Sequence, residues 1–198
     1  MNYFDKVSNK YELNKFNILH SVIKKREEIV FKQILKRIKI RGKNNAIDLG
    51  AGSGFYSKIL YSKGIKKITC VDTSKKMLSK IRIKNVNLIN KNVLKIKNKK
   101  KFDLIIVMGL LEFINNYKNL LKKVTNFAKK NSSIIILMPK LNIFSFFYFF
   151  HHILNGNKIS FHNEKEVIKL LKFLGWKKIN MVSTFPSSTF LFASFYNE

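Results

Sequence analysis

The chain has 198 residues, enough for one domain with a substantial core and too few for two comfortable domains. It carries 39 lysines and arginines against 11 acids, and this net charge of +28 points to a polyanionic partner such as RNA, DNA or an anionic membrane. Nearly all of the charge is lysine, however, and an AT-rich genome also produces such a composition, so a merely solvated lysine-rich surface explains the charge as well.

A single cysteine, Cys70, lies in an apolar stretch, so an intrachain disulfide is excluded and a small core residue is expected. No apolar run approaches the roughly 20 residues that span a bilayer. The first residues include Asp5 and Glu12 and lack the apolar region of a secretory signal. These features predict a cytoplasmic enzyme.

The first regular element is a predicted helix over Leu19–Ile40. Its apolar residues Phe31, Ile34, Leu35 and Ile38 follow the spacing i, i+3, i+4, i+7, with lysines between them. This spacing indicates one buried helical face.

A strand, a glycine-rich turn and a helix follow. The strand is predicted over Asn45–Leu49 and carries Asp48, and the helix is predicted to run from near Gly54 to about Lys63. Glycine lacks Cβ, so the chain can turn tightly and let a ligand approach bare backbone. The start of the helix offers backbone N–H groups to an anionic group. This stretch predicts a nucleotide-type site.

The spacing of the turn distinguishes between nucleotide-type ligands. It reads Asp48-x-Gly50-x-Gly52-x-Gly54, whereas dinucleotide-binding turns read G-x-G-x-x-G. The Asp48 carboxylate would repel a pyrophosphate but suits a ligand with an ammonium group, such as S-adenosylmethionine (SAM). The chain resembles the class I SAM-dependent methyltransferases, whose first motif is an acid followed by this glycine pattern.

Downstream residues extend the resemblance over about residues 45–197. Asp72 ends a predicted strand over Lys67–Val71, 24 residues after Asp48, where a carboxylate accepts the hydroxyls of a ribose; the alternative is a helix N-cap. Asn92 follows a third strand, at the place where the family often has an acid for the adenine amino group. The resemblance implies SAM as the cofactor, held by Asp48, Gly50, Ala51, Gly52, Gly54, Asp72, Thr73, Met77, Asn92, Val93, Met108 and Gly109.

The remaining elements complete an α/β fold. The third, fourth and fifth strands are predicted over Asn87–Asn90, Phe102–Met108 and Ser133–Met138, helices over Asn116–Lys130 and from Asn163 to Leu174, and two final strands over Trp176–Phe185 and Ser188–Tyr196. The resemblance implies a Rossmann-like, doubly wound, seven-stranded sheet with helices on both faces and a terminal antiparallel hairpin. Its domains would be an N-terminal helical lid or cap over residues 1–40 and a SAM-binding methyltransferase domain over residues 41–198, in a single unit.

An aromatic-rich segment after the fifth strand is the least ordinary part of the chain. Residues 140–162 are expected to form a lid insertion over an apolar or aromatic acceptor, a membrane-surface helix beside lysines, or ordinary core packing. Removing a proton from the acceptor calls for a base, and the candidates are His162, His151 and Glu112. No metal-ligand spacing occurs, so no metal is expected.

The resemblance is best with the small-molecule group that includes quinone-biosynthesis methyltransferases. It therefore implies a methyl transfer to a small, apolar or aromatic acceptor. A tRNA or RNA methyltransferase, or a non-catalytic basic protein that binds nucleic acid with a SAM-like fold, stays open as the alternative because of the charge of +28. Contact with an anionic membrane surface is a further expectation.

Overall fold

The structure is a computed structural model that describes residues 17–38, 45–97, 100–140, 142, 159–184 and 188–195. For residues 17–20 it describes the backbone alone. Its helices are α3 (Asn17–Arg37), α4 (Phe55–Ser62), α5 (Lys75–Leu78), α6 (Tyr117–Thr125) and α8 (Glu164–Phe173), with short 3₁₀ turns η1 (Val93–Lys95) and η2 (Leu111–Phe113). Its strands are β1 (Asn45–Leu49), β2 (Lys67–Asp72), β3 (Val86–Asn90), β4 (Phe102–Met108), β5 (Ala128–Pro139), β6 (Trp176–Thr184) and β7 (Ser188–Phe195).

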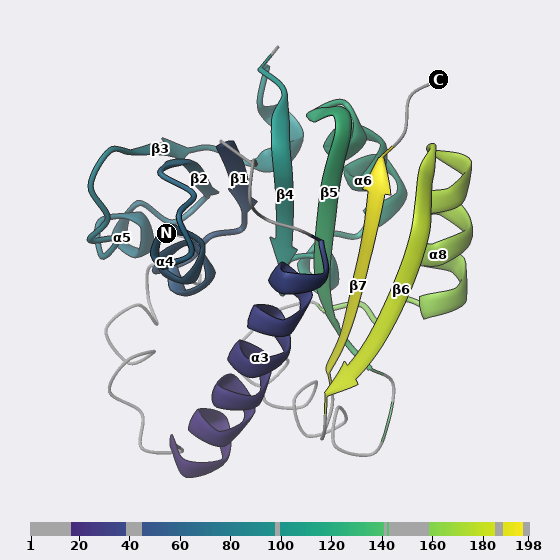
Figure 1. Ribbon diagram of the computed structural model, residues 1–198, viewed down its shortest axis with the longest axis horizontal. Coiled ribbons are helices and arrows are strands. Elements are labelled where there is room, and N and C mark those ends of the chain that lie inside the picture. Colours follow the sequence, from purple (N-terminus) through teal and green to yellow (C-terminus); the bar gives the residue numbers. More distant parts are fainter. Residues whose placement is uncertain are drawn as a thin grey trace.

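The seven strands form one sheet in the order β3-β2-β1-β4-β5-β7-β6 (Figure 1). Strands β1 to β5 pair in parallel, whereas β7 pairs antiparallel with both β5 and β6. This arrangement confirms the predicted doubly wound sheet and its terminal hairpin. The chain winds outward from β1 to β3 and then returns to β4 on the other side of β1. Ligands of open α/β sheets bind at the carboxyl edge of such a reversal.

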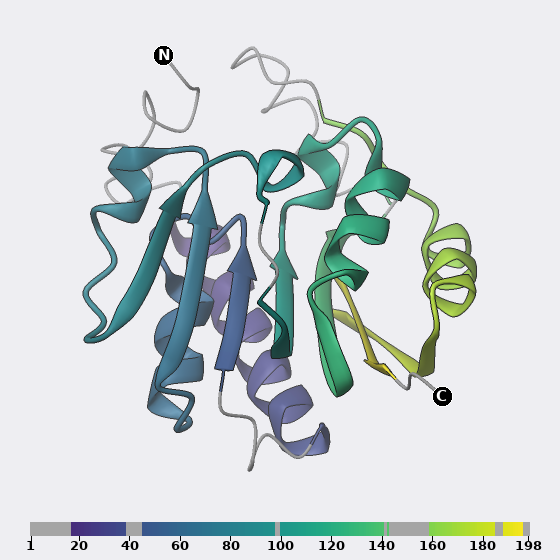
Figure 2. The ribbon, with the colours of Figure 1, turned by 90° about the horizontal axis from the view of Figure 1, so that it is seen from above.

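Helices cover both faces of the sheet, with α3 and α4 on one face and α6 and α8 on the other (Figure 2). Side chains of a strand alternate between the faces. In β1, Ala46 therefore packs in the cluster of α3 and α4, whereas Ile47 and Leu49 pack in the cluster of α6 and α8. The predicted apolar face of the first helix is confirmed, because Phe31, Ile34 and Leu35 are buried, with Ile38 packed beside them. Among the described residues, no helix is both long enough and apolar enough to span a membrane.

The predicted helix over Asn116–Lys130 is wrong at its C-terminal end. Helix α6 ends at Thr125 and β5 begins at Ala128, five residues before the predicted strand. Phe127 and Ala128 are buried in the core, and the Phe127 carbonyl accepts a hydrogen bond from the N–H of Phe102 in β4. Burial of these side chains and pairing with β4 therefore prevail over the helical preference of the lysines that follow.

One polar contact joins α6 to β6 across the sheet's edge. Trp176 is 1% exposed, and its indole N–H donates a hydrogen bond to the Thr125 hydroxyl at 2.9 Å. We predict that Thr125→Val lowers the free energy of unfolding by about 1 to 3 kcal/mol, because a buried N–H loses its acceptor without a change of shape. Urea unfolding followed by the fluorescence of the single tryptophan measures this. Thr125→Ser is the control and should stay close to wild type; an equal loss in both variants contradicts the prediction.

Candidate active site

The turn between β1 and α4 lies at the carboxyl edge of the sheet. Gly50, Gly52 and Gly54 have φ of 78°, 52° and 79°, a conformation that disfavours residues with a Cβ. A Cβ on Gly50 would lie 3.1 Å from Leu110, and one on Gly54 would lie 2.9 Å from Ile81. A Cβ on Gly52 would meet only the Met77 methyl carbon, at 3.7 Å. The chain's own packing thus restricts Gly50 and Gly54, whereas among the described residues a Cβ on Gly52 would make only an ordinary contact with Met77.

Hydrogen bonds to β2 fix this turn. The N–H groups of Gly50 and Ala51 donate to the Val71 carbonyl at 2.9 and 3.0 Å, and that of Gly52 donates to the Asp72 carboxylate at 2.8 Å. These donors are therefore engaged within the chain. Within the described residues, the N-cap residue of α4 is Gly54, which provides no side-chain cap, and the Gly54 N–H donates to the Ala51 carbonyl at 2.8 Å.

The Asp72 carboxylate joins the turn to the end of β2. Besides Gly52, it accepts a hydrogen bond from the N–H of Ser74 at 2.8 Å. Ser74, whose hydroxyl accepts from the Met77 N–H, is the N-cap of α5, so the N-cap alternative for Asp72 is wrong. A carboxylate can accept about four hydrogen bonds, and these contacts are compatible with ribose hydroxyls at the same group. Thr73, the next predicted contact, is exposed.

Two asparagines lie near the end of β3. The side-chain oxygen of Asn92, the predicted adenine contact, accepts from the Leu94 N–H at 2.9 Å and caps η1, while Val93 is buried. Asn90 was not among the predicted site residues. Its side-chain amide donates to the carbonyls of Asp72 and Thr73 at 3.1 and 2.9 Å. An asparagine at the end of a strand belongs to no recognisable sequence motif, so only the structure reveals these two hydrogen bonds.

Asp48 lies beneath the turn and is 1% exposed. Its Oδ2 accepts a hydrogen bond from the Ser57 hydroxyl of α4 at 2.6 Å, and that hydroxyl lies 3.1 Å from the Cys70 sulfur. Its Oδ1 is buried and has no hydrogen-bond partner in the part of the chain that the structure describes. Burial raises the pKa of the Asp48 carboxyl from 3.8 to about 7; the Ser57 hydrogen bond opposes the rise and the Asp72 charge adds to it. Burial likewise raises the pKa of the Cys70 thiol to about 12, which agrees with the expected core role.

The end of β4 supplies the other side of the site. Met108 is 7% exposed, and Gly109 follows it with φ of 66°. Glu112 in η2 is 4% exposed, and its Oε1 lies 3.6 Å from the place of a Cβ on Gly109. A buried carboxyl group therefore lies next to Gly109, the first residue after β4.

Two contacts hold the last residues of the insertion against η2. The Ser160 N–H donates to the Glu112 carbonyl at 2.7 Å, and Nε2 of His162 lies 3.0 Å from the Leu111 carbonyl. A carbonyl only accepts, so this nitrogen carries the proton and Nδ1 is the basic nitrogen of the neutral ring. The His162 ring also packs on Tyr117 at 4.3 Å between centroids. The structure thus places His162 against η2, the 3₁₀ turn that contains Glu112.

Other predicted features fall outside the described residues. His151 and most of the insertion over residues 140–162 lie there, as do residues 1–16 of the proposed lid. Within the described ranges, no group of three or more histidine, cysteine, aspartate or glutamate side chains has an arrangement that could hold a metal ion.

The raised pKa of Asp48 makes stability depend on pH. Between pH 3.8 and about 7, the native state binds more protons than the unfolded state. The contribution of Asp48 to the free energy of unfolding is therefore greatest below pH 3.8 and falls as the pH rises to about 7. Asp48→Asn removes this titration and can keep the Ser57 hydrogen bond. From about pH 4 to about pH 8, the free energy of unfolding of wild type should fall relative to the variant by on the order of 4 kcal/mol, at about 1.36 kcal/mol per pKa unit. Denaturant titrations at several pH values measure the difference, and a difference that does not change with pH contradicts the prediction.

Comparison with known proteins shows what this chain is similar to. Residues 47–136 match the family model of a methyltransferase domain. The chain is 26% identical over 188 residues to a ubiquinone biosynthesis O-methyltransferase of Pelagibacter ubique, covering 85% of this chain and 76% of that protein. It is 25% identical over 141 residues to the Rickettsia typhi protein of the same name, covering 67% of this chain and 57% of that protein.

A solved structure shows the same fold. Magnesium protoporphyrin IX methyltransferase from Synechocystis PCC 6803, with bound SAH, gives a TM-score of 0.76 at 16% identity, covering 98% of this chain and 96% of that chain. The matched domain includes the glycine turn, Asp72 and β4, and the strand order agrees with the fold that the turn predicted. The chain is therefore a SAM-dependent methyltransferase with the class I fold.

Proposed function

We propose that this methyltransferase acts on an oxygen of a small, largely apolar aromatic acceptor of the phenol type. The observation that carries the proposal is the similarity to two proteins named ubiquinone biosynthesis O-methyltransferases, along 85% and 67% of this chain. A phenol has an ordinary pKa of about 10, so its oxygen becomes a good nucleophile only when a base removes the proton.

The proposed cofactor site lies across the open backbone of Gly52. Asp72 accepts the ribose hydroxyls, and Met77 packs beside the same glycine. Asp48 offers its buried Oδ1 to the ammonium end of the cofactor, directly or through water. SAM, when bound, supplies a methyl group already activated by the positive sulfur. The other residues proposed to contact the cofactor are Gly50, Ala51, Gly54, Thr73, Asn92, Val93, Met108 and Gly109.

The proposed acceptor end lies at Gly109 and η2. Glu112 would receive the proton of the acceptor hydroxyl, and SAM, when bound, would supply the methyl group to that oxygen and leave as S-adenosylhomocysteine. His162 holds the last residues of the insertion against η2, and its Nδ1 is the second candidate for the base. His151 is the third candidate for the base. Burial of Glu112 excludes water from the proton transfer.

We predict that purified protein methylates simple phenols with SAM and that Glu112→Gln lowers kcat by about 100-fold or more, the usual contribution of a general base. Product masses from a panel of phenols and catechols, with tRNA as a parallel substrate, measure the activity.

Binding of S-adenosylhomocysteine (SAH) to Glu112→Gln is the control and should stay within about twofold of wild type. Methylation of tRNA in place of every phenol contradicts the proposed acceptor and favours the nucleic-acid alternative that the +28 charge raises. Full activity of Glu112→Gln on a phenol contradicts the proposed base, leaving the acceptor class intact.

The glycines of the turn provide a matched pair for the cofactor site. Gly52→Ala and Gly54→Ala both place a Cβ at positive φ, but only the second drives it to 2.9 Å from Ile81. We predict that Gly54→Ala loses about 1 kcal/mol or more of stability relative to Gly52→Ala. Gly52→Ala should instead lose at least about tenfold in SAH affinity, because its methyl group occupies the ligand's approach.

Thermal melting and calorimetric titration with SAH separate the two effects. If Gly52→Ala binds SAH as wild type does, the ligand does not approach this backbone.

A further inference from the structure

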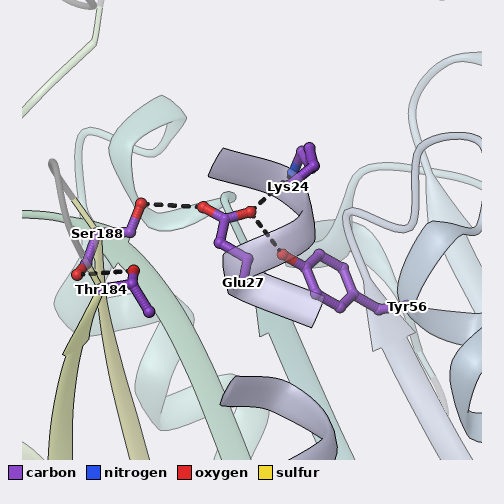
Figure 3. Close-up of polar contacts among 5 residues, drawn as sticks. All are labelled: Lys24, Glu27, Tyr56, Thr184 and Ser188. Atoms are coloured by element: carbon purple, nitrogen blue, oxygen red, sulfur yellow. Dashed lines mark hydrogen bonds and ion pairs between the residues drawn. The ribbon is translucent and has the colours of Figure 1, made fainter. Parts of the chain in front are cut away.

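A buried carboxylate in α3 links three elements that are far apart in the sequence. Glu27 is 4% exposed. It accepts hydrogen bonds from the hydroxyls of Tyr56 in α4 and Ser188 in β7, both at 2.9 Å, and the Lys24 ammonium lies 3.1 Å from it (Figure 3). A buried carboxylate is costly unless it has such donors. Glu27 therefore fixes α3 against both α4 and the terminal hairpin.

This link lies at the same edge of the sheet as the glycine turn. Ser188 is the first residue of β7 and pairs with Pro139 at the carboxyl end of β5. Tyr56 is the second residue of α4, two residues after Gly54. Glu27 thus contacts the helix turn that directly continues the cofactor-binding backbone.

Two neighbouring side chains hold this first turn of α4 from different sides. Ser57 is bonded to Asp48 in the sheet at 2.6 Å. Tyr56 is bonded to Glu27 in α3, and its ring packs edge-on against Phe31 with centroids 5.0 Å apart. These two contacts hold the first turn of α4 from different directions, in addition to the packing of the buried Ile59 and Leu60. Loss of the Tyr56 hydroxyl leaves the ring packing and removes only the polar anchor.

We propose that Glu27 is a positioning residue for the cofactor: through the Tyr56 hydroxyl it holds the start of α4, and with it the glycine turn, in the geometry that binds SAM. This rests on the placement of the cofactor at the turn proposed above. The apparent affinity for a ligand falls in proportion to the fraction of protein in the competent geometry. A turn that is competent about a tenth of the time therefore binds about tenfold more weakly.

The three-way contact offers a matched pair of variants. Tyr56→Phe and Ser188→Ala each remove one hydroxyl that donates to the same carboxylate at the same distance of 2.9 Å. They differ in whether α4 or β7 is released. We expect SAH to bind about tenfold more weakly to Tyr56→Phe and within about twofold of wild type to Ser188→Ala, with comparable drops in melting temperature. Calorimetric titration of the full-length variants with SAH, well below their melting temperatures, measures the affinities.

A purely structural role for Glu27 predicts a different pattern. If Tyr56→Phe and Ser188→Ala change SAH affinity by the same factor, or if neither changes it, the positioning role is overturned. Glu27→Gln combined with Tyr56→Phe should bind SAH no more weakly than the weaker single variant, because both changes break one link; a further multiplicative loss overturns the route through Tyr56.

Asp72→Ala separates this inference from the site on which it rests. Loss of SAH binding in Asp72→Ala, with wild-type affinity in Tyr56→Phe, overturns the role of Glu27 and leaves the cofactor site standing. Unchanged SAH binding in Asp72→Ala overturns the placement of the cofactor, and the role of Glu27 falls with it. Weaker SAH binding in both Asp72→Ala and Tyr56→Phe supports both the placement of the cofactor and the role of Glu27.

Discussion

The hydrogen bonds between the glycine turn and the end of β2 determine the geometry of the whole site. Val71 receives two N–H groups of the turn on its carbonyl, and Asp72 receives a third on its carboxylate. The turn is thereby pressed against its neighbours, with Leu110 on one side and Ile81 on the other. Glycine is the residue that fits such a confined backbone at positive φ. Among the described residues, only the Met77 methyl carbon lies within 4 Å of the place of a Cβ on Gly52.

Three acids among the described residues of this basic chain are buried at or beside the proposed cofactor site. Glu27, Asp48 and Glu112, among the described residues, are buried to 4% exposure or less, and all belong to the carboxyl edge of the sheet or to contacts with its first turn. The lysines, by contrast, lie mostly on the exposed surface. SAM carries positive charge at its sulfur and ammonium groups, so buried carboxylates favour it while the basic surface does not. The net charge of +28 consequently describes the exterior and is a poor guide to the chemistry of the site.

Local patterns in the sequence predicted the strands, the glycine turn and the position of Asp72, because each follows from neighbouring residues: apolar runs, alternate glycines and an acid at a strand end. The end of α6 was missed because the lysines after Phe127 favour a helix, and only the burial of Phe127 and Ala128 and the pairing with β4 end it there. Glu27 was missed because its partners lie 29 and 161 residues away. Polar contacts of this range depend on the completed packing of helices on the sheet, which no local pattern contains.

The measurement that tests the cofactor site most directly is a crystal structure of the protein grown with SAH. We expect SAH to lie across Gly52, with its ribose hydroxyls on Asp72 and its sulfur directed toward Gly109. The turn itself should keep its hydrogen bonds to Val71 and Asp72, since it is already held by them. SAH bound at another place, or a turn that must break these bonds to admit it, would contradict the site described here.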